Sequence, residues 1–374
     1  MPDSPAPDAP LVVPHALGRY AVATAPLDTL GARLADAGLV PDAPGALALV
    51  VTDATVGALY ADRLAALLAD AGSAPRVLTV PAGEASKSLA HLGALYDAAL
   101  GLDVLPSRRT PVFALGGGVV GDLGGLFAAT LLRGLPLVHL PTTLLAMVDS
   151  SLGGKTGINH ARGKNLIGTT TAPRLVLADP ALLATLDDRE FAAGLAEAVK
   201  HALIADADAV GWFEAHLDRV LARDADAVDL VVRRAQAVKA RVVMEDEFET
   251  GVRAHLNFGH TFAHAFEALA GYDGTLLHGE AVAHGMRCAV ALSARIGTLS
   301  PADAGRLDAL VARLPAAPLP PMTADAAIAA MATDKKRGAT GLRFVVVDGI
   351  GRAAVRAAVP EADVRAALAV VGLR

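Results

Sequence analysis

Short apolar runs alternate with longer stretches rich in alanine and leucine from about residue 20 to residue 180. This alternation constrains the fold most strongly, because strands that alternate with helices form a parallel sheet with helices on both faces. Helices are expected over 56–72 and 88–102. The predicted strands are 46–53, 76–80, 111–118, 135–141 and 174–179.

The pattern changes after Pro180, where long stretches with helical periodicity dominate. They cover 189–204, 226–247, 260–271 and 279–297, and a hairpin is expected near 342–355 around Asp348-Gly349. The fold class is therefore α/β. We predict a Rossmann-like, doubly wound parallel-sheet domain over 15–185 and a mainly α-helical domain over 186–374. Residues 1–14 are expected to form a disordered leader.

The composition excludes several classes of protein. Of the 374 residues 53% are hydrophobic, and the formal net charge is −6, so a core is available and the basic face of a nucleic-acid binder is not expected. The single cysteine, Cys288, indicates a reducing compartment. The longest uncharged stretch, 134–148, is too short and too polar to cross a bilayer. We expect a cytoplasmic protein without membrane or nucleic-acid partners.

A glycine-rich segment follows the third predicted strand. Gly116, Gly118 and Gly121 satisfy the G-x-G-x-x-G spacing, in which glycines let a pyrophosphate approach the N-terminus of a helix. The motif follows the third strand instead of the first, and no acidic residue on a following strand is an evident ribose ligand. The motif therefore fits either a dinucleotide site or a tight structural turn.

A second glycine-rich segment, 149–165, contains Gly154-Lys155-Thr156. It is not a P-loop, because Asp149 stands where the first glycine of that motif is required. We interpret it as a loop that offers backbone donors and lysine charges to an anion, or else as a solvated surface loop.

Histidines concentrate in one part of the helical region. Five of the 11 fall between residues 255 and 284, and His260 and His264 share a helix face. The zinc-protease pattern fails because Thr261 follows the first of that pair. Two histidines and a distant carboxylate remain a plausible open metal site, but periodicity does not select which histidines bind. Those five histidines are His255, His260, His264, His278 and His284.

Lysine is rare in this chain, with seven among 33 basic residues. Lysine differs from arginine as a compact and flexible cation, so these positions are candidates for ligand contacts. Convergence of Lys200, Lys239 and Arg253 would be costly without an anion, and would indicate a small polyanionic ligand such as a phosphate that also carries a carboxylate. The alternative is unrelated surface charge.

Five long segments of the chain carry a specific pattern. They are GGGVVGDLGG (116–125), LPTTLLAMVDSSLGGKTGINH (140–160), GKNLIG (163–168), GLAEAVKHALI (194–204) and LNFGHTFAHAFE (256–267). Together they resemble the 3-dehydroquinate synthase family, and the resemblance runs from about residue 50 to residue 336. The chain departs from the family pattern at Thr55, Ala161-Arg162 and 168–173, positions that concern loop packing and cofactor affinity.

The resemblance implies a residue set for each cofactor. The ligands of Zn²⁺ or Co²⁺ would be Glu197, His260 and His278. The NAD-binding residues would be Asp53, Glu84, Lys87, Gly116, Gly117, Gly118, Gly121, Asp122, Thr142, Thr143, Lys155, Lys164 and Thr185.

The resemblance also implies how a phosphorylated sugar acid would be held. Lys239 and Arg253 would bind its carboxylate. Its phosphate would be bound by Lys155, Asn165, Asn257 and Lys336, with Arg133 reaching in from the partner of a homodimer. Asp149 and Lys200 would bind ring hydroxyls, and His264 would transfer protons.

The implied activity is that of a phosphorus-oxygen lyase. Transient oxidation by NAD would acidify a neighbouring C–H, phosphate would leave by β-elimination, and reduction, ring opening and an aldol reaction would follow. A related sugar-phosphate cyclase or a metal-dependent alcohol dehydrogenase are the alternatives. A dehydrogenase would not explain Lys155, Asn165 and Lys239, and a silent NAD or phosphate sensor would not need an intact metal set.

Overall fold

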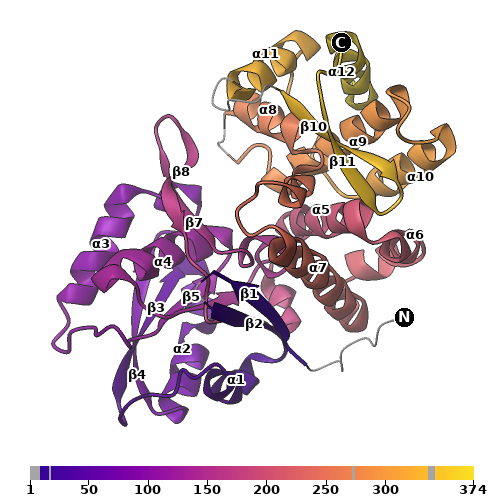
Figure 1. Cartoon of the computed structure of the whole chain (residues 1–374). Coiled ribbons are helices and arrows are strands. Elements are labelled where there is room, and N and C mark those ends of the chain that lie inside the picture. Colours follow the sequence, from indigo (N-terminus) through magenta and orange to yellow (C-terminus); the bar gives the residue numbers. More distant parts are fainter. Residues whose placement is uncertain (1–8, 17, 272–273, 336–341) are drawn as a thin grey trace. The chain divides into compact units, whose positions relative to one another are not determined.

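The computed structural model describes residues 9–16, 18–271, 274–335 and 342–374, with side chains omitted for 333–335. The chain divides into two compact units, up to Leu186 and from Asp187 onward, one residue beyond the boundary expected from the sequence. None of the helices in the described part of the chain is long and apolar enough to cross a membrane. Figure 1 labels most of the helices and strands of both units.

The first unit contains a seven-stranded sheet in the order β1-β2-β9-β6-β5-β3-β4. All neighbouring strands are parallel except β1 and β2, so the predicted doubly wound, largely parallel sheet is confirmed. The strands are β1 Leu11–His15, β2 Gly18–Thr24, β3 Ala46–Asp53, β4 Ser73–Val80, β5 Val112–Gly116, β6 Leu137–Pro141 and β9 Leu175–Ala178.

Helices cover both faces of this sheet because its central strands are apolar on both sides. Along β3, Leu49 and Val51 join the core under α3 and α4, whereas Ala48 and Val50 join the core under α1 and α2. This alternation with a period of two is what a strand buried on both faces requires. The helices are α1 Leu30–Asp36, α2 Ala54–Asp70, α3 Leu89–Leu100 and α4 Gly118–Thr130.

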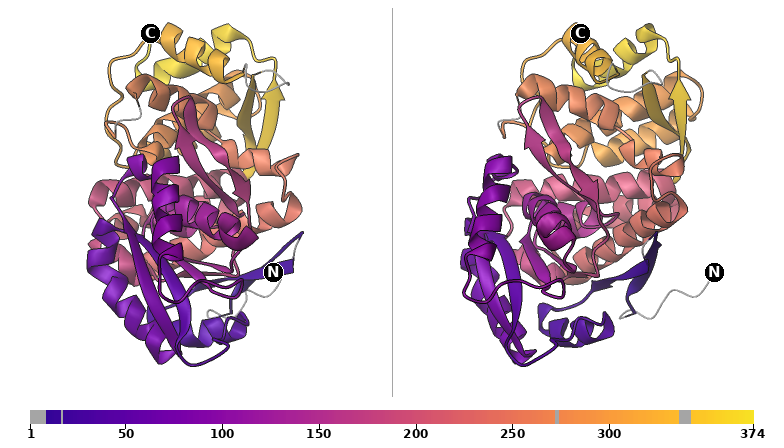
Figure 2. Two further views of the ribbon diagram at one scale, coloured as in Figure 1. Left: turned by 90° about the vertical axis from the view of Figure 1, so that its left-hand side faces the viewer. Right: turned by 60° about the vertical axis from the view of Figure 1, so that its left-hand side comes forward.

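Two segments of this unit differ from the sequence prediction. Residues 11–14, expected within a disordered leader, form β1 together with His15, because Val13 is buried and the segment pairs antiparallel with β2. The expected loop 149–165 contains most of a hairpin, β7 (Lys155–His160) and β8 (Gly163–Thr170). Figure 2 shows this hairpin, in magenta, standing apart from the strands of the main sheet.

The second unit is mainly helical, as predicted. Its C-terminal hairpin forms over β10 (Arg343–Gly349) and β11 (Arg352–Ala357), but the pairing of Gly349 with Arg352 places the turn at Ile350-Gly351 and not at Asp348-Gly349. The left-handed φ of +72° at Gly351 suits such a turn. The helices are α5 Asp188–Ala205, α6 Ala207–Leu221, α7 Ala225–Glu245, α8 His260–Ala270, α9 His278–Arg295, α10 Pro301–Val311, α11 Ala324–Lys335 and α12 Glu361–Leu368.

Candidate active site

Three potential metal ligands meet inside the second unit. Glu197 lies on α5, His260 begins α8 and His278 begins α9. Glu197 Oε1 lies 3.6 Å from the Nε2 atom of each histidine, and one ligand atom from each residue falls within 4.8 Å of the others. One carboxylate and two imidazoles at such distances can surround a single ion and leave a coordination position open.

Close backbone contacts bring these three helices together. A Cβ at Gly279 would collide with the backbone of Ala193, one turn before Glu197 on α5. A Cβ at Gly285 would likewise collide with the backbone of Gly259, which precedes His260. The two glycines of α9 therefore let this helix approach α5 and α8 closely enough for the three ligands to converge.

The remaining ring nitrogens of the two histidines have acceptors behind them. His260 Nδ1 lies 3.2 Å from the carbonyl oxygen of Phe258, and His278 Nδ1 lies 3.1 Å from Glu267 Oε2. A proton on each Nδ1 leaves the Nε2 lone pair directed at the site, which is the arrangement of histidines that ligate zinc. Glu267 was not predicted from the sequence, although it shares the α8 face of His260 and His264 at helical spacing.

The electrostatics of the group also fit a cation. Burial, followed by the charge of Lys200, lowers the pKa of His260 to about 3, so its imidazole is neutral at pH 7. Burial lowers the pKa of His278 too, but the hydrogen bond to Glu267 and the charges of Glu267 and Glu197 outweigh it and raise the pKa. Lys200 and Glu197 are each 1% exposed and form an ion pair. The donor set therefore fits Zn²⁺ or Co²⁺.

His264 lies beside the ligands without joining them. Its ring centroid is 5.5 Å from that of His260 and 6.4 Å from that of His278, and its side chain is exposed. The two other histidines of the sequence cluster, His255 and His284, are not part of the ligand group. His284 Nε2 lies 2.8 Å from the carbonyl oxygen of Ala317.

The two cations expected to bind a carboxylate are both buried in the second unit. Lys239, on α7, is 7% exposed, and Arg253, on the 3₁₀ turn Val252–Asn257, is 3% exposed. The amide of Asn257 donates to Glu249 Oε1 at 3.1 Å. The guanidinium of Arg253 also donates to the carbonyl of Glu247. Buried cations are rare in proteins unless an anion accompanies them.

Asp246 organises the loop that carries Arg253, a role that was not predicted from the sequence. Its carboxylate accepts hydrogen bonds from the backbone nitrogens of Thr250, Gly251 and Arg253, at 2.9, 2.7 and 3.0 Å. These bonds, that of Thr250 first, lower the pKa of Asp246 to about 2. A carboxylate with several backbone donors fixes a loop while it remains ionised.

Asp246→Asn is therefore expected to destabilise the protein in a pH-dependent way. Because the folded pKa lies below the unfolded value, the carboxylate stabilises the fold above about pH 4 and loses this effect as the pH falls toward 2. Thermal unfolding at pH 7 should show a lower Tm for the variant, with the difference shrinking below pH 4. Asp229→Asn is the control, because Asp229 forms a partly buried pair with Arg233 within α7. A pH-independent difference would contradict the assignment.

The carboxyl ends of three strands in the first unit, β3, β5 and β6, form the expected cofactor region. The chain passes from β3 to β4 and then to β5 on the other side of β3, which makes the β3/β5 boundary the switch point where nucleotides bind in such sheets. Gly117 there caps the N-terminus of α4, and Asp53 caps α2 by accepting from the nitrogens of Thr55 and Val56. Among the described residues the buried Thr142 hydroxyl lacks a hydrogen-bond partner. These features fit a dinucleotide.

Lys87 connects this region to the β7–β8 hairpin. It is 5% exposed, and its Nζ lies 2.7 Å from Asp122 Oδ2, 2.6 Å from Asn165 Oδ1 and 3.6 Å from Glu84 Oε1. Asn159 donates to Glu84 and accepts from the backbone of Asn165. The structure thus brings together four predicted residues, namely Glu84, Lys87, Asp122 and Asn165. The amide oxygen of Asn165 accepts a hydrogen bond from Lys87.

The other predicted residues of the first unit are more dispersed. Thr185 Oγ1 lies 2.6 Å from the Tyr60 hydroxyl, and Arg133 is exposed with a left-handed φ of +67°. Of the remaining ones, Lys155 is exposed, and Asp149, Thr143 and Lys164 are partly buried. Gly116 ends β5, and Gly118 and Gly121 lie on α4. Lys336, in the C-terminal part of the chain, lies outside the described residues.

Comparisons with known proteins give the same family for both units. The family models described as 3-dehydroquinate synthase N-terminal and C-terminal match residues 77–193 and 194–337. A 3-dehydroquinate synthase of Salinibacter ruber is 48% identical over 371 residues, which cover 96% of this chain and 97% of that protein.

Solved structures of two related enzymes are similar over nearly the whole chain. A 2-epi-5-epi-valiolone synthase from Streptomyces hygroscopicus, with NAD⁺ and Zn²⁺ bound, has a TM-score of 0.82 at 35% identity, covering 94% of this chain and 96% of that one. A 2-deoxy-scyllo-inosose synthase, in complex with carbaglucose-6-phosphate, NAD⁺ and Co²⁺, has a TM-score of 0.82 at 27% identity, with coverage of 92% and 94%. Together with the ligand geometry, these matches show that the chain belongs to the 3-dehydroquinate synthase family.

Proposed function

We propose that this chain is a phosphorus-oxygen lyase that converts 3-deoxy-D-arabino-heptulosonate 7-phosphate to 3-dehydroquinate and phosphate. The observation that carries the proposal is the convergence of Glu197, His260 and His278 in a unit that also buries Lys239 and Arg253. The membership of the chain in its family supports the same reaction. The product belongs to aromatic amino-acid biosynthesis by the shikimate pathway.

Glu197, His260 and His278 would hold Zn²⁺ or Co²⁺, and the β3/β5 switch point would hold NAD. When bound, the metal supplies a Lewis acid for a substrate oxygen, and NAD accepts and returns a hydride. The buried Lys200 holds the Glu197 carboxylate by its ion pair. His264, exposed beside His260, would move protons to and from the substrate, because an imidazole can both donate and accept a proton.

The remaining residues would hold the ends of the substrate. Lys239 and Arg253 would bind its carboxylate, which distinguishes this substrate from sugars without an acid group. Asp149 and Lys200 would bind ring hydroxyls. The phosphate would be bound by Lys155, Asn165, Asn257 and Lys336.

We also propose a cytoplasmic homodimer in which Arg133 completes the phosphate site of the partner. Leu132 and Arg133 are both exposed and both have left-handed backbone conformations, at φ +51° and +67°. Such strain persists where the surrounding structure requires it. Mixed dimers of Arg133→Ala and His260→Ala chains should regain activity in one of their two sites if the arginine acts across the interface.

The stoichiometry of NADH and phosphate tests the function. We expect a catalytic amount of NAD to support many turnovers, with one phosphate released per substrate and no accumulation of NADH, because the hydride returns to the molecule that gave it. Phosphate release and absorbance from NADH are followed in the same cuvette with heptulosonate phosphate. Stoichiometric NADH without phosphate would indicate a metal-dependent alcohol dehydrogenase instead.

A further inference from the structure

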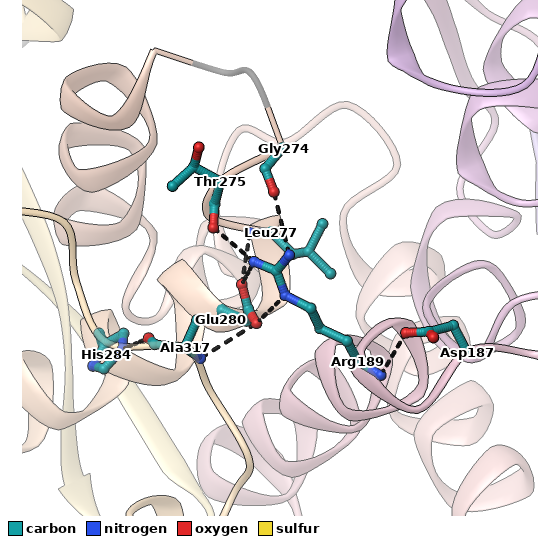
Figure 3. A network of polar contacts seen from close by, with 8 residues as sticks. All are labelled: Asp187, Arg189, Gly274, Thr275, Leu277, Glu280, His284 and Ala317. Carbon is teal, nitrogen blue, oxygen red and sulfur yellow. Dashed lines mark hydrogen bonds and ion pairs between the residues drawn. The ribbon is translucent and has the colours of Figure 1, made fainter.

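An arginine outside the ligand group connects α5 to the start of α9. Arg189, in the first turn of α5, donates from Nε to Glu280 Oε1 at 2.7 Å and from Nη2 to Glu280 Oε2 at 2.6 Å. Its Nη2 also donates to the carbonyl of Thr275 at 2.7 Å. Figure 3 shows the guanidinium between Glu280 and the segment that leads into α9. A bidentate arginine–carboxylate pair fixes both the distance between the two side chains and their relative orientation.

The carboxylate of Glu280 accepts hydrogen bonds from three different segments of the chain. It is 2% exposed, and its Oε2 accepts from the backbone nitrogen of Leu277 at 2.8 Å, which satisfies an unpaired donor at the N-terminus of α9. Its Oε1 lies 3.3 Å from the nitrogen of Ala317, in the loop after α10. The carboxylate is thus bonded to α5, to the residue before His278 and to the Ala317 loop (Figure 3).

His278 lies in the turn that this network holds. It stands between Leu277, whose nitrogen bonds to Glu280, and Gly279, which packs against the backbone of Ala193 on α5. Arg189 therefore lies on the same helix as Glu197, and through Glu280 and the carbonyl of Thr275 it is bonded to the turn that carries His278. The distance between His278 Nε2 and Glu197 Oε1, 3.6 Å, depends on how α9 begins relative to α5.

We propose that Arg189 is a positioning residue for the metal ligand His278. The pair with Glu280 fixes the first turn of α9, so that the His278 imidazole is already aimed at the position of the ion. This inference rests on the proposed metal site, and concerns a residue that does not itself contact metal, substrate or cofactor.

The proposal predicts a defect in metal affinity and not in the chemistry. Without the guanidinium, Glu280 keeps its bonds to the nitrogens of Leu277 and Ala317, but it loses its charge partner. Helix α9 then keeps the packing of Gly279 on α5 but loses the side-chain attachment through Arg189. The first turn of α9 then has to be ordered when the ion binds. Removing groups that orient a metal ligand weakens binding about 10- to 100-fold. Saturating zinc should restore kcat.

The experiment is a competitive zinc titration of chelator-stripped protein, with a chromophoric chelator as the probe. Arg189→Met is expected to raise the zinc Kd at least about tenfold. Arg306→Met is the matched control, because Arg306 makes the same two-bond pair, with Glu214, away from the ligand helices. It should leave the zinc Kd unchanged.

A conservative variant keeps the test decisive if Arg189→Met folds poorly. Arg189→Lys retains the positive charge but cannot make the bidentate pair with Glu280, so its zinc Kd should lie between those of the wild type and Arg189→Met. A wild-type Kd in Arg189→Lys or Arg189→Met overturns the proposal. His278→Ala separates the two levels of inference: if it binds zinc like the wild type, the ligand assignment itself fails, whereas loss of zinc only in His278→Ala rejects Arg189 alone.

Discussion

His260→Ala is expected to lower kcat/KM at least about a thousandfold and to abolish stoichiometric zinc binding. The variant removes one of the three proposed ligands, whose atoms converge within 4.8 Å. The two proposed ligands that remain are already paired, Glu197 with Lys200 and His278 with Glu267. Zinc content after dialysis and phosphate release are the two measurements. Exhaustive chelation of the wild type should reproduce the defect, and zinc or cobalt should reverse it.

His284→Ala is the matched control for that substitution. His284 lies on α9 like His278, is partly buried, and contacts the carbonyl of Ala317 outside the ligand group. Burial lowers its pKa, so the imidazole is neutral at pH 7, as a ligand would also be. The variant should keep its zinc and stay within a few-fold of wild-type activity. Loss of zinc from this variant, or full activity in metal-free wild type, would contradict the assignment of ligands.

The sequence predicted the part of the fold that follows local periodicity. The predicted strand at 46–53 matches β3 residue for residue, because the apolar run has the length of a buried strand and ends at Asp53, which caps the next helix. The β7–β8 hairpin escaped prediction since its second strand, from Gly163 to Thr170, is mostly exposed and shows no alternation of apolar and polar residues. Strand β1 was missed for a related reason: Pro14 and a short length obscured it.

From the residues alone, the type of metal site could be predicted, but not which histidines are its ligands. The spacing of His260 and His264 places both on one helix face, yet only His260 is a ligand candidate in the structure. The selection depends on long-range contacts, above all the close approach of Gly279 to Ala193, that bring α9 against α5. Periodicity carries no such information, and resemblance to the family supplied it. Glu267 could have been found from helical spacing. Arg189 pairs with the side chain of Glu280, far along the chain, and Asp246 accepts from backbone nitrogens, and sequence patterns reveal neither contact.

Lys239→Met is expected to reduce kcat/KM about 30- to 4,000-fold. The estimate corresponds to the ~2–5 kcal/mol cost of leaving a buried charge without its partner. Lys239 is 7% exposed on α7, so water cannot replace its ammonium group at the carboxylate of a bound substrate. Methionine has a similar length and apolar stem, and it removes the charge while preserving the packing. Steady-state kinetics with heptulosonate phosphate measure the effect.

The loss should be confined to substrate recognition if Lys239 acts by binding the carboxylate. The zinc Kd and the NAD Kd should stay at their wild-type values, because the ligand group and the β3/β5 switch point do not include this residue. Arg241→Met is the control on the same helix: Arg241 is exposed and donates to the carbonyl of Ala205. Near-normal kcat/KM for Lys239→Met, or equal losses in the two variants, would remove Lys239 from the substrate site. Arg253 would then have to bind the carboxylate alone, and its substitution would carry the full effect.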